Sequence, residues 1–392
     1  MFNELKRNKW LIAMSASGIH ICIGSVYAWS VLVLPIMNFT QWSLFSITVT
    51  FSIAILFLGL SAGYFGKYVE KYGASKSGLT SMAFFVTGML GSALSLYLQN
   101  VYLLYLFYGV LGGIGLGIGY ITPISTLIKY FPNNRGFATG LAIMSFGFAS
   151  MIAAPLMNYL VAEYGLITNF VIMAVFYSVI MTISSLYLDS PEYKENGDSL
   201  PPTEVYSTWQ FKALWHIFFV NIACGIALLS IISPMVQEVL GFSPERAAGL
   251  VGIIGLVNGF GRIFWSTFSD YVGRNNVYLL FFIIQIVAFF FLATTINEFV
   301  FEILILAIIS CYGGGFSCMP AYLADIFCGK HLSQIHGRIL TAWGIAGIAG
   351  PIMIALGKQY LGSYNLILYM FCGLFFLNLI VAYILKERSK NL

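Results

Sequence analysis

The stretch Ser266-Thr267-Phe268-Ser269-Asp270-Tyr271-Val272-Gly273-Arg274 decides the fold, because an earlier part of the chain has the same pattern. Two hundred residues before it, the sequence reads Gly66-Lys67-Tyr68-Val69-Glu70-Lys71-Tyr72-Gly73. In both stretches a glycine stands three positions after an acidic residue. A second pair of segments also matches, because Gly115–Pro123 and Tyr312–Pro320 are each rich in glycine and end in proline. The two matches predict a chain built from two similar halves.

The composition around these stretches is that of a membrane protein. Hydrophobic residues make up 59% of the 392 residues, and charged residues only 9%. A typical soluble domain carries about 25% charged residues, and a soluble chain of this length could not cover its surface with so few charges. This excludes an ordinary cytosolic enzyme, a secreted disulfide scaffold, a nucleic-acid binder and a disordered protein. We therefore expect a lipid bilayer around most of the chain.

The apolar stretches divide into twelve predicted spans, each of about 20 residues or more, which is the length that a helix needs to cross a bilayer. They cover approximately residues 10–37, 43–66, 78–98, 102–128, 137–161, 166–188, 213–236, 247–269, 277–296, 300–323, 338–357 and 364–385. The first stretch follows several basic residues but is too long for the core of a signal peptide, so we interpret it as a retained span.

The fold class predicted from these spans is an all-α membrane protein with two pseudo-symmetric bundles of six helices. Residues 1–188 form the first bundle and residues 213–392 the second. The polar stretch 189–212, which contains Pro201-Pro202 and several charges, is the predicted linker between them.

The basic residues predict the orientation of the chain in the membrane. Most of the 19 Lys and Arg residues fall on the side of the termini and the linker. Only Arg246 and Lys358 fall on the other side, and Arg262 lies inside a span. Because basic loops stay in the cytoplasm, both termini and the linker are expected there, in a multi-pass protein of the cell membrane, the inner membrane in a bacterium.

With these motifs the chain resembles the major facilitator superfamily, whose signature is an acid-x-x-Gly-Arg loop after the second and the eighth span. Within it, the chain resembles the branch of oxalate/formate antiporters and monocarboxylate transporters. The resemblance rests on segments from both halves, which are Gly24–Ser30, Tyr108–Pro123 with Tyr130–Gly136, Asn258–Arg262 leading to Ser269–Arg274, and Thr341–Gly344. It implies a secondary transporter that moves a small organic anion by alternating access. A monocarboxylate such as lactate, pyruvate or formate is expected, with proton symport and anion exchange both open.

Arg262 is the sharpest candidate for substrate binding. It lies eight residues from Asp270, hence about 12 Å into a hydrocarbon core of about 30 Å. None of the 15 acidic residues is expected at that depth, so an anionic substrate is the natural counter-ion. A planar guanidinium suits a carboxylate, and the resemblance places the substrate-binding Arg in this segment. The alternative is a structural Arg that snorkels or contacts helix carbonyls.

Asn258 and Trp343 are candidates whose identity bears on the substrate. Asn258 stands one helical turn before Arg262, so it either hydrogen-bonds the substrate or bridges helices. Animal monocarboxylate transporters resemble this segment but carry Asp there, so the Asn removes one proton-carrying group. Oxalate-transporting members carry Lys in the place of Trp343. The resemblance therefore implies a single central charge, which favours a monocarboxylate or an anion with a bulky apolar part, unless Trp343 only packs.

Three phenols and one imidazole complete the predicted site. Tyr27, Tyr120 and Tyr312 fall at mid-span depth, where a hydroxyl can donate to a carboxylate, although packing explains most tyrosines in such a chain. His20 is the other titratable group inside a span, so it is a candidate for proton coupling, with a buried neutral His as the alternative.

Asp270 and Arg274, with Glu70, Lys71 and Lys76, are interpreted as gating charges on the cytoplasmic face, or else as solvated loop residues that set topology.

Other functions fit the sequence less well. A membrane enzyme would need a nucleophile with its base or a metal cluster, and the spans contain neither, so we expect no catalytic residue, no metal and no cofactor. A carrier of a larger or neutral metabolite and a receptor on the same scaffold remain as alternatives. The expected partners are the small anion and the lipid bilayer, without nucleic acid, for a monomeric protein.

Overall fold

The computed structural model describes residues 7–131, 135–189, 202–327 and 332–389. Within these ranges every regular element is helical, and twelve helical stretches are long and apolar enough to cross a membrane. The predicted all-α membrane fold with twelve spans is therefore confirmed.

The first six spans are formed by the helices up to residue 187. Two of these spans consist of several helical elements, and one long helix covers two spans. The elements are α1 (Lys9–Gly24), η1 (Ser25–Ala28), α2 (Trp29–Thr40), α3 (Leu44–Tyr97), α4 (Val101–Leu104), η2 (Tyr105–Gly112), α5 (Gly113–Tyr130), α6 (Arg135–Tyr164) and α7 (Leu166–Tyr187). The first span is α1 and α2 joined by the 3-10 turn η1, and the fourth is α4 and α5 joined by the π-helical η2. The long α3 holds spans two and three.

The last six spans each correspond to one helix. They are α9 (Trp209–Leu240), α10 (Pro244–Val272), α11 (Arg274–Leu292), α12 (Glu298–Phe327), α13 (Leu332–Leu361) and α14 (Asn365–Ser389), preceded by the short α8 (Pro202–Ser207). Span seven begins at Trp209, earlier than the expected position near 213, because the hydroxyl of Thr208 accepts a hydrogen bond from the Phe211 N–H and caps the helix.

The repeated loop motif has a structural reason for its glycine. Gly73 and Gly273 have φ angles of 81° and 89°, with ψ near the extended range, and residues with side chains rarely adopt this conformation. Gly73 breaks α3 between spans two and three, and Gly273 separates α10 from α11. The same turn therefore occurs at the matching place in both repeats.

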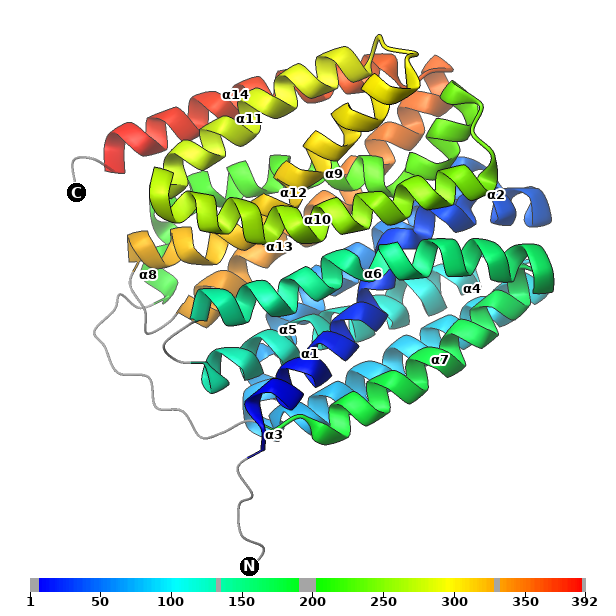
Figure 1. Cartoon of the computed structure of the whole chain (residues 1–392), viewed down its shortest axis with the longest axis horizontal. Coiled ribbons are helices and arrows are strands. Elements are labelled where there is room, and N and C mark those ends of the chain that lie inside the picture. Colours follow the sequence, from blue (N-terminus) through cyan, green and yellow to red (C-terminus); the bar gives the residue numbers. More distant parts are fainter. Residues whose placement is uncertain (1–6, 132–134, 190–201, 328–331, 390–392) are drawn as a thin grey trace, which may run out of the picture.

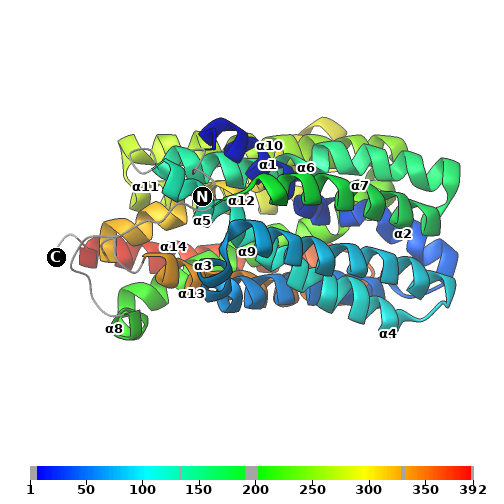
Figure 2. The same cartoon turned by 90° about the horizontal axis from the view of Figure 1, so that it is seen from below.

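The first described helix begins, and the last described helix ends, on one side of the helical assembly. The beginning of α1, the end of α14 and the short α8 all lie at the left in Figure 1, and we call this side the terminal face and the opposite side the far face. In Figure 1 helices α1 and α3 to α7 occupy the lower part and α9 to α14 the upper part. Seen from below, most helices run along the long axis of the molecule (Figure 2).

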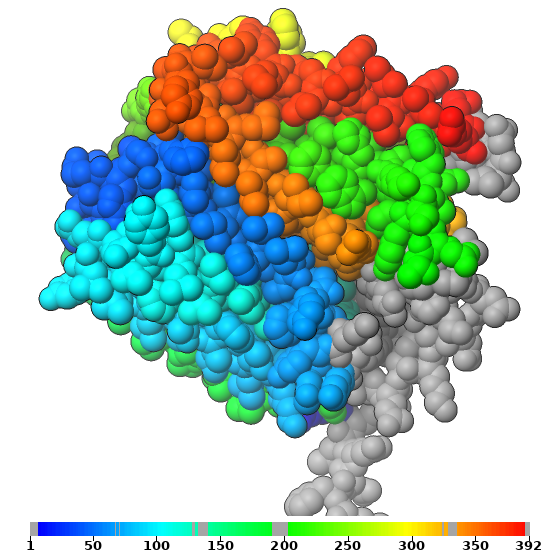
Figure 3. Space-filling view, turned by 180° about the vertical axis from the view of Figure 1, so that it is seen from behind, coloured from blue at the N-terminus to red at the C-terminus, as the bar shows by residue number. Residues whose placement is uncertain are grey.

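Two helix pairs make the most extensive contacts between the first six spans and the last six. Helix α3 packs against α13 and α6 against α10, and Figure 3 shows the orange α13 lying along the blue α3. The backbones touch at glycines, since a Cβ added at Gly59 would lie 2.6 Å from the Gly344 Cα and one at Gly147 would lie 2.9 Å from the Gly259 Cα. Small residues allow this close approach. We call the contact between the first six spans and the last six the seam, and it runs past the centre of the molecule.

On the far face a groove of about 550 Å³ lies between the two sets of helices. It is lined from α2 and the start of α3 on one side and from α9 and α13 on the other, by Leu34, Met37, Ser43, Leu44, Phe45, Pro234, Gln237, Glu238, Ala355, Lys358, Gln359 and Tyr364. The two sets of helices are therefore separated by a groove at the far face.

Candidate substrate-binding site

Arg262 lies at the centre of the molecule, 1% exposed, on α10. Its Nη1 donates a hydrogen bond of 2.5 Å to the Ile143 carbonyl of α6, across the seam. Its Nε donates to the Asn258 Oδ1 at 3.4 Å, one helical turn away. Among the residues that the structure describes, no carboxylate pairs with this guanidinium. The expected lack of an acidic partner thus holds there, although a backbone carbonyl compensates part of the charge.

Two phenylalanine rings flank the guanidinium. The Arg262 Cζ lies 5.4 Å from the centroid of Phe316 and 5.9 Å from that of Phe146. The faces of aromatic rings attract cations, and this attraction is larger where water is excluded. The rings, from α12 and α6, therefore stabilise a buried positive charge without neutralising it.

Trp343 closes the site from α13. Its ring lies edge-on to Phe316 at 4.8 Å and to Tyr120 at 5.0 Å between centroids. The indole is 0% exposed, and in the part of the chain that the structure describes its Nε1 has no hydrogen-bond partner. The Asn258 Nδ2 is likewise buried without a partner. Unsatisfied buried donors cost free energy, so two N–H groups at this site are available for an acceptor that the protein does not supply.

Tyr27 and Tyr312 meet on the same cluster from opposite halves of the chain. Their hydroxyl groups lie 2.7 Å apart in a hydrogen bond, and both side chains are buried. The Tyr27 ring packs edge-on against Phe146 at 5.1 Å, and the Tyr312 ring against Phe316 at 5.2 Å. The pair therefore joins η1 to α12 beside the guanidinium.

His20 occupies the side of the cluster formed by α1. Its ring stacks on Tyr120 at 5.5 Å between centroids and meets Phe146 edge-on at 5.9 Å. Both ring nitrogens face backbone carbonyls, with Nδ1 2.5 Å from the Ala142 oxygen and Nε2 3.0 Å from the Tyr120 oxygen. The imidazole is 0% exposed.

Glycines give these side chains their room. A Cβ on Gly313 would lie 2.5 Å from the Asn258 Oδ1, and one on Gly225 would lie 2.4 Å from the ring of Tyr312. Gly313 belongs to the glycine-rich segment of α12, so that segment lets α12 lie directly against the polar face of α10. The glycine-rich segment that recurs in both halves therefore makes room for side chains at the centre of the molecule.

The structure brings together all seven candidates for substrate or proton binding. They are Arg262, Asn258, Tyr312, Tyr27, Tyr120, Trp343 and His20. Sequence reasoning missed Phe146, Phe316 and the Ile143 carbonyl. Phe316 had a signal, because it stands four residues after Tyr312 on the same helix and so shares its face. Phe146 is one apolar residue in an apolar helix and had none.

The sequence matches the family model of the Major Facilitator Superfamily over residues 14–319 and 259–392. The chain belongs to this superfamily. Its members with related sequences include the Uncharacterized MFS-type transporter YhjX of Escherichia coli (strain K12), 25% identical over 88% of this chain and 87% of that protein. The Oxalate:formate antiporter of Oxalobacter formigenes is 24% identical over 88% of this chain and 83% of its own length. Monocarboxylate transporter 10 of Homo sapiens is 23% identical over 77% of this chain and 62% of its own length. The protein is thus a multi-pass membrane transporter of the superfamily.

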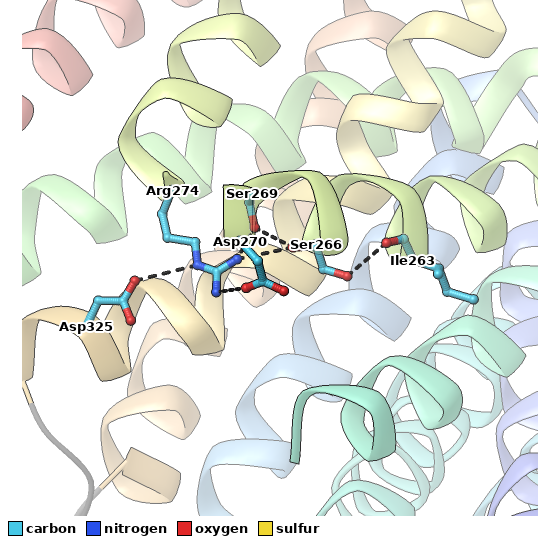
Figure 4. Close-up of polar contacts among 6 residues, drawn as sticks. All are labelled: Ile263, Ser266, Ser269, Asp270, Arg274 and Asp325. Atoms are coloured by element: carbon cyan, nitrogen blue, oxygen red, sulfur yellow. Dashed lines mark hydrogen bonds and ion pairs between the residues drawn. The ribbon is translucent and has the colours of Figure 1, made fainter. Parts of the chain in front are cut away.

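The loop motif of this superfamily member forms an ion-pair cluster on the terminal face. Figure 4 shows the Arg274 guanidinium between Asp270 of α10 and Asp325 of α12. Its Nε lies 3.5 Å from the Asp325 Oδ2, and its Nη1 donates to the Ser266 carbonyl at 3.1 Å and to the Ser269 hydroxyl. The cluster therefore joins three helices of the second half, and Asp325 is a member that the motif did not reveal.

Of the matching charges of the first half, Lys71 and Lys76 make no contact with this cluster within the described residues. The side chain of Glu70 lies outside the described residues. Lys71 is exposed and lies over the ring of Tyr72, with its Nζ 5.1 Å from the centroid. Among the described residues, neither Lys71 nor Lys76 forms an ion pair. The gating role of Glu70, Lys71 and Lys76 stays a prediction.

The groove on the far face has its own charged pair. Lys358 of α13 forms an ion pair with Glu238 of α9 and donates to the Gly362 carbonyl at 3.0 Å. The Tyr364 hydroxyl donates to the other oxygen of Glu238 at 3.5 Å. Burial, and secondly the negative charge of Glu238, raise the pKa of Tyr364, so this hydroxyl stays protonated and remains a donor at neutral pH.

Proposed function

We propose that this protein is a secondary carrier of a small organic anion, most simply a monocarboxylate such as lactate, pyruvate or formate. Residues 1–188 and 213–392 act as the two moving halves, joined by the linker 189–212, and the anion binds between them beside Arg262. Alternating access then exposes the site first to one face and then to the other.

A single observation carries the proposal, namely the buried Arg262, which has no acidic partner among the residues that the structure describes. A guanidinium inside a membrane protein costs about 2.5 to 3.5 kcal/mol on insertion scales, so it is retained for a reason. Its fork matches both oxygens of a carboxylate. The unpartnered Nδ2 of Asn258 and Nε1 of Trp343 supply two further donors next to it.

The size of the central charge favours a monocarboxylate over a dicarboxylate. Arg262 is the one Lys or Arg side chain among the described residues of the cluster, with the rings of Phe146 and Phe316 beside it and Trp343 packed on both rings. A second carboxylate would be buried among these rings without a cation. Two relatives carry carboxylate transport in their names, the Oxalate:formate antiporter and Monocarboxylate transporter 10, which supports a carboxylate as the cargo.

The same rings also support a second candidate. An anion with a bulky apolar part, or a larger neutral metabolite, gains contact area against Trp343 and Tyr120 that formate does not. A neutral cargo would leave the charge of Arg262 unmatched, so the larger anion is the better version of this alternative. A receptor that binds the anion without moving it is the remaining outcome.

The setting of the proposed carrier follows from the basic residues. The terminal face is the cytoplasmic side, because most Lys and Arg residues belong to it, and the membrane is the bacterial inner membrane. The protein works as a monomer, without catalysis and without a cofactor, and its energy comes from a gradient or from exchange.

Counterflow in proteoliposomes tests the proposal. We expect the wild-type protein to exchange labelled lactate, pyruvate or formate, and Arg262→Ala to lose at least about 100-fold in rate, since each charge-assisted hydrogen bond contributes about 1.5 to 3 kcal/mol. The matched control is Arg246→Ala, which removes a half-exposed arginine from the far end of the same helix. Full transport by Arg262→Ala would contradict the substrate role. Binding without counterflow in the wild-type protein would indicate the receptor.

A further inference from the structure

The glycine-rich segments of the two halves are held in the same way by the span that precedes them. In the first half, the Ser81 hydroxyl of α3 donates a hydrogen bond of 2.7 Å to the Gly115 carbonyl of α5. In the second half, the Tyr278 hydroxyl of α11 donates one of 2.7 Å to the Gly315 carbonyl of α12. Both donor side chains are 0% exposed. The third span of each half therefore holds the fourth span through a main-chain carbonyl.

Each of these bonds reaches a helix that its own sequence weakens. Pro123 in α5 and Pro320 in α12 have no N–H, so neither can donate to the carbonyl four residues earlier. Those carbonyls belong to Gly119 and Phe316. The two hydroxyl donors are separated by the same number of positions as the two prolines, so the donor and the weakened turn recur together in the repeat.

The weakened turns carry two aromatic rings of the proposed binding site. Tyr120 directly follows the glycine at the weakened turn of α5, and a Cβ on that glycine would lie 2.5 Å from the Ser81 oxygen. Phe316 directly follows Gly315, whose carbonyl accepts the bond from α11. The two rings meet Trp343 edge-on, at 5.0 and 4.8 Å between centroids. The hydroxyl bonds are thus made at the turns whose rings close on the indole.

These rings limit the room beside the guanidinium. The Arg262 Cζ lies 5.4 Å from the centroid of Phe316, so a carboxylate bound to Arg262 has this ring as its neighbour. Packed interiors have little spare volume, so a ring that is held from behind keeps its place. A ring on a weakened turn without such a bond can shift when a larger group enters.

We propose that Ser81 and Tyr278 are positioning residues that set the size of the anion accepted beside Arg262. Both hydroxyls are engaged with main-chain carbonyls, so they act through the rings of Tyr120 and Phe316 and not on the anion. By holding the two turns they favour a small anion over one with a bulky apolar part. The inference rests on the proposed function and deepens it by naming what limits the size of the cargo.

Competition binding to purified wild-type protein and two single variants tests the inference. Unlabelled formate, or phenylpyruvate with its bulky ring, displaces labelled pyruvate, and the ratio of the two inhibition constants measures the size selectivity. Ser81→Ala and Tyr278→Phe each remove one oxygen atom, so they delete the bond and leave the packing almost unchanged. We expect each variant to raise the affinity for phenylpyruvate relative to formate about 3- to 10-fold, the value of one neutral hydrogen bond.

Two matched variants control for the loss of a buried hydroxyl. Ser77→Ala removes a hydroxyl one turn earlier in α3, which donates at 2.8 Å to a carbonyl of its own helix. Tyr322→Phe removes a phenol of α12 that donates to Asn275 and whose ring lies 5.5 Å from that of Tyr278. Neither hydroxyl holds a glycine-rich segment, so both variants should keep the wild-type ratio.

The outcomes separate this inference from the function on which it rests. An unchanged ratio in folded Ser81→Ala or Tyr278→Phe would overturn the positioning role of that residue, as would an equal shift in its control. Pyruvate binding and counterflow by the wild-type protein would then still support the carrier function. Because the two variants lie in different halves, either one decides the inference if the other does not fold. Absence of binding for every carboxylate would overturn the proposed function, and this inference with it.

Discussion

The hydroxyl groups of Tyr27 and Tyr312 lie 2.7 Å apart, although the two residues are separated by 285 positions in the sequence. One hydroxyl comes from the first half of the chain and the other from the second, and both are buried beside Arg262. Each phenol has the other as its hydrogen-bond partner. In the proposed carrier an incoming carboxylate can replace one hydroxyl as the hydrogen-bond partner of the other. The bond between the two hydroxyls therefore depends both on whether the anion is bound and on whether the two halves are in contact.

We predict that Tyr27→Phe and Tyr312→Phe each destabilise the protein by about 1 to 3 kcal/mol, because each removes the hydrogen bond that joins the two buried hydroxyls. The double variant should lose clearly less than the sum of the two. Thermal or denaturant unfolding of the four proteins measures this cycle. Additive losses would show that the two hydroxyls do not depend on each other.

A methyl group at Gly59 should drive the two halves apart on the terminal side. A Cβ there would lie 2.6 Å from both the Cα and the N of Gly344, and backbone atoms cannot move aside as a side chain can. Gly59→Ala should therefore disfavour the packed arrangement and increase the population that is open toward the terminal face. Spin labels at Lys76→Cys and Arg338→Cys, in a background without native cysteines, measure the separation.

The matched control for this experiment is Gly63→Ala, one turn along the same helix. A Cβ at Gly63 would meet only the Gly337 carbonyl oxygen, at an ordinary 3.6 Å. Its distance distribution should resemble that of the parent protein. Equal distributions for Gly59→Ala and Gly63→Ala would contradict the idea that the glycine contact holds the halves together.

Trp343→Lys should move the preference of the site toward dicarboxylates. The new ammonium would stand next to the aromatic cluster around Arg262 and pair with a second carboxylate. A charged hydrogen bond contributes about 1.5 to 3 kcal/mol, so the ratio of oxalate to formate affinity should rise about tenfold or more. Competition binding measures the ratio. An unchanged ratio in a folded variant would remove Trp343 from the site.

Trp343→Phe provides a finer test at the same position. It keeps an aromatic ring and removes the unpartnered Nε1 donor together with the rest of the pyrrole ring. If that N–H binds the anion, the affinity should fall by about 3- to 10-fold, the value of a neutral hydrogen bond of about 0.5 to 1.5 kcal/mol. An unchanged affinity would mean that Trp343 only packs against Phe316 and Tyr120.

Arg274→Ala should slow transport while the dissociation constant of the anion changes less than about threefold. Arg274 is the first residue of α11 and joins α10, α11 and α12 at the terminal face, beyond the end of the helix that carries Arg262, so its loss should disturb the movement of the second half and not the binding site. Asp325→Asn should have the smaller effect, because its side chain is 59% exposed and such pairs contribute about 0 to 1 kcal/mol. Initial rates and equilibrium binding separate the two quantities.

Much of the fold could be predicted because its causes are local. Apolar length determines where a helix can cross a bilayer, and the twelve predicted spans correspond to the twelve observed ones. The recurring glycine of the loop motif marks a backbone angle that other residues avoid, and Gly73 and Gly273 both adopt it. The early start of α9 was missed because a single capping residue, Thr208, decides it.

The candidate site could be predicted only as a set of side chains, not as an arrangement. Arg262 was conspicuous because it is a charge in an apolar span, and His20 because it is titratable. Their partners carry no such mark, since the Ile143 and Ala142 groups that they contact are main-chain carbonyls, which every residue has. Phe146 packs against His20, Tyr27, Tyr120 and Trp343 and lies beside Arg262, yet it looks like ordinary packing in the sequence.

The bond from Arg262 to the Ile143 carbonyl matters most when the carrier is unladen. It runs from α10 of the second half to α6 of the first, and in the proposed carrier the carbonyl oxygen accepts from an N–H of Arg262 that could otherwise donate to the carboxylate. In a carrier that works as proposed, this main-chain oxygen compensates part of the Arg262 charge while the empty carrier changes back from one state to the other. The two halves can then pack together around Arg262 when no anion is bound. Because the acceptor is a main-chain carbonyl, a substitution of the side chain at position 143 does not remove it.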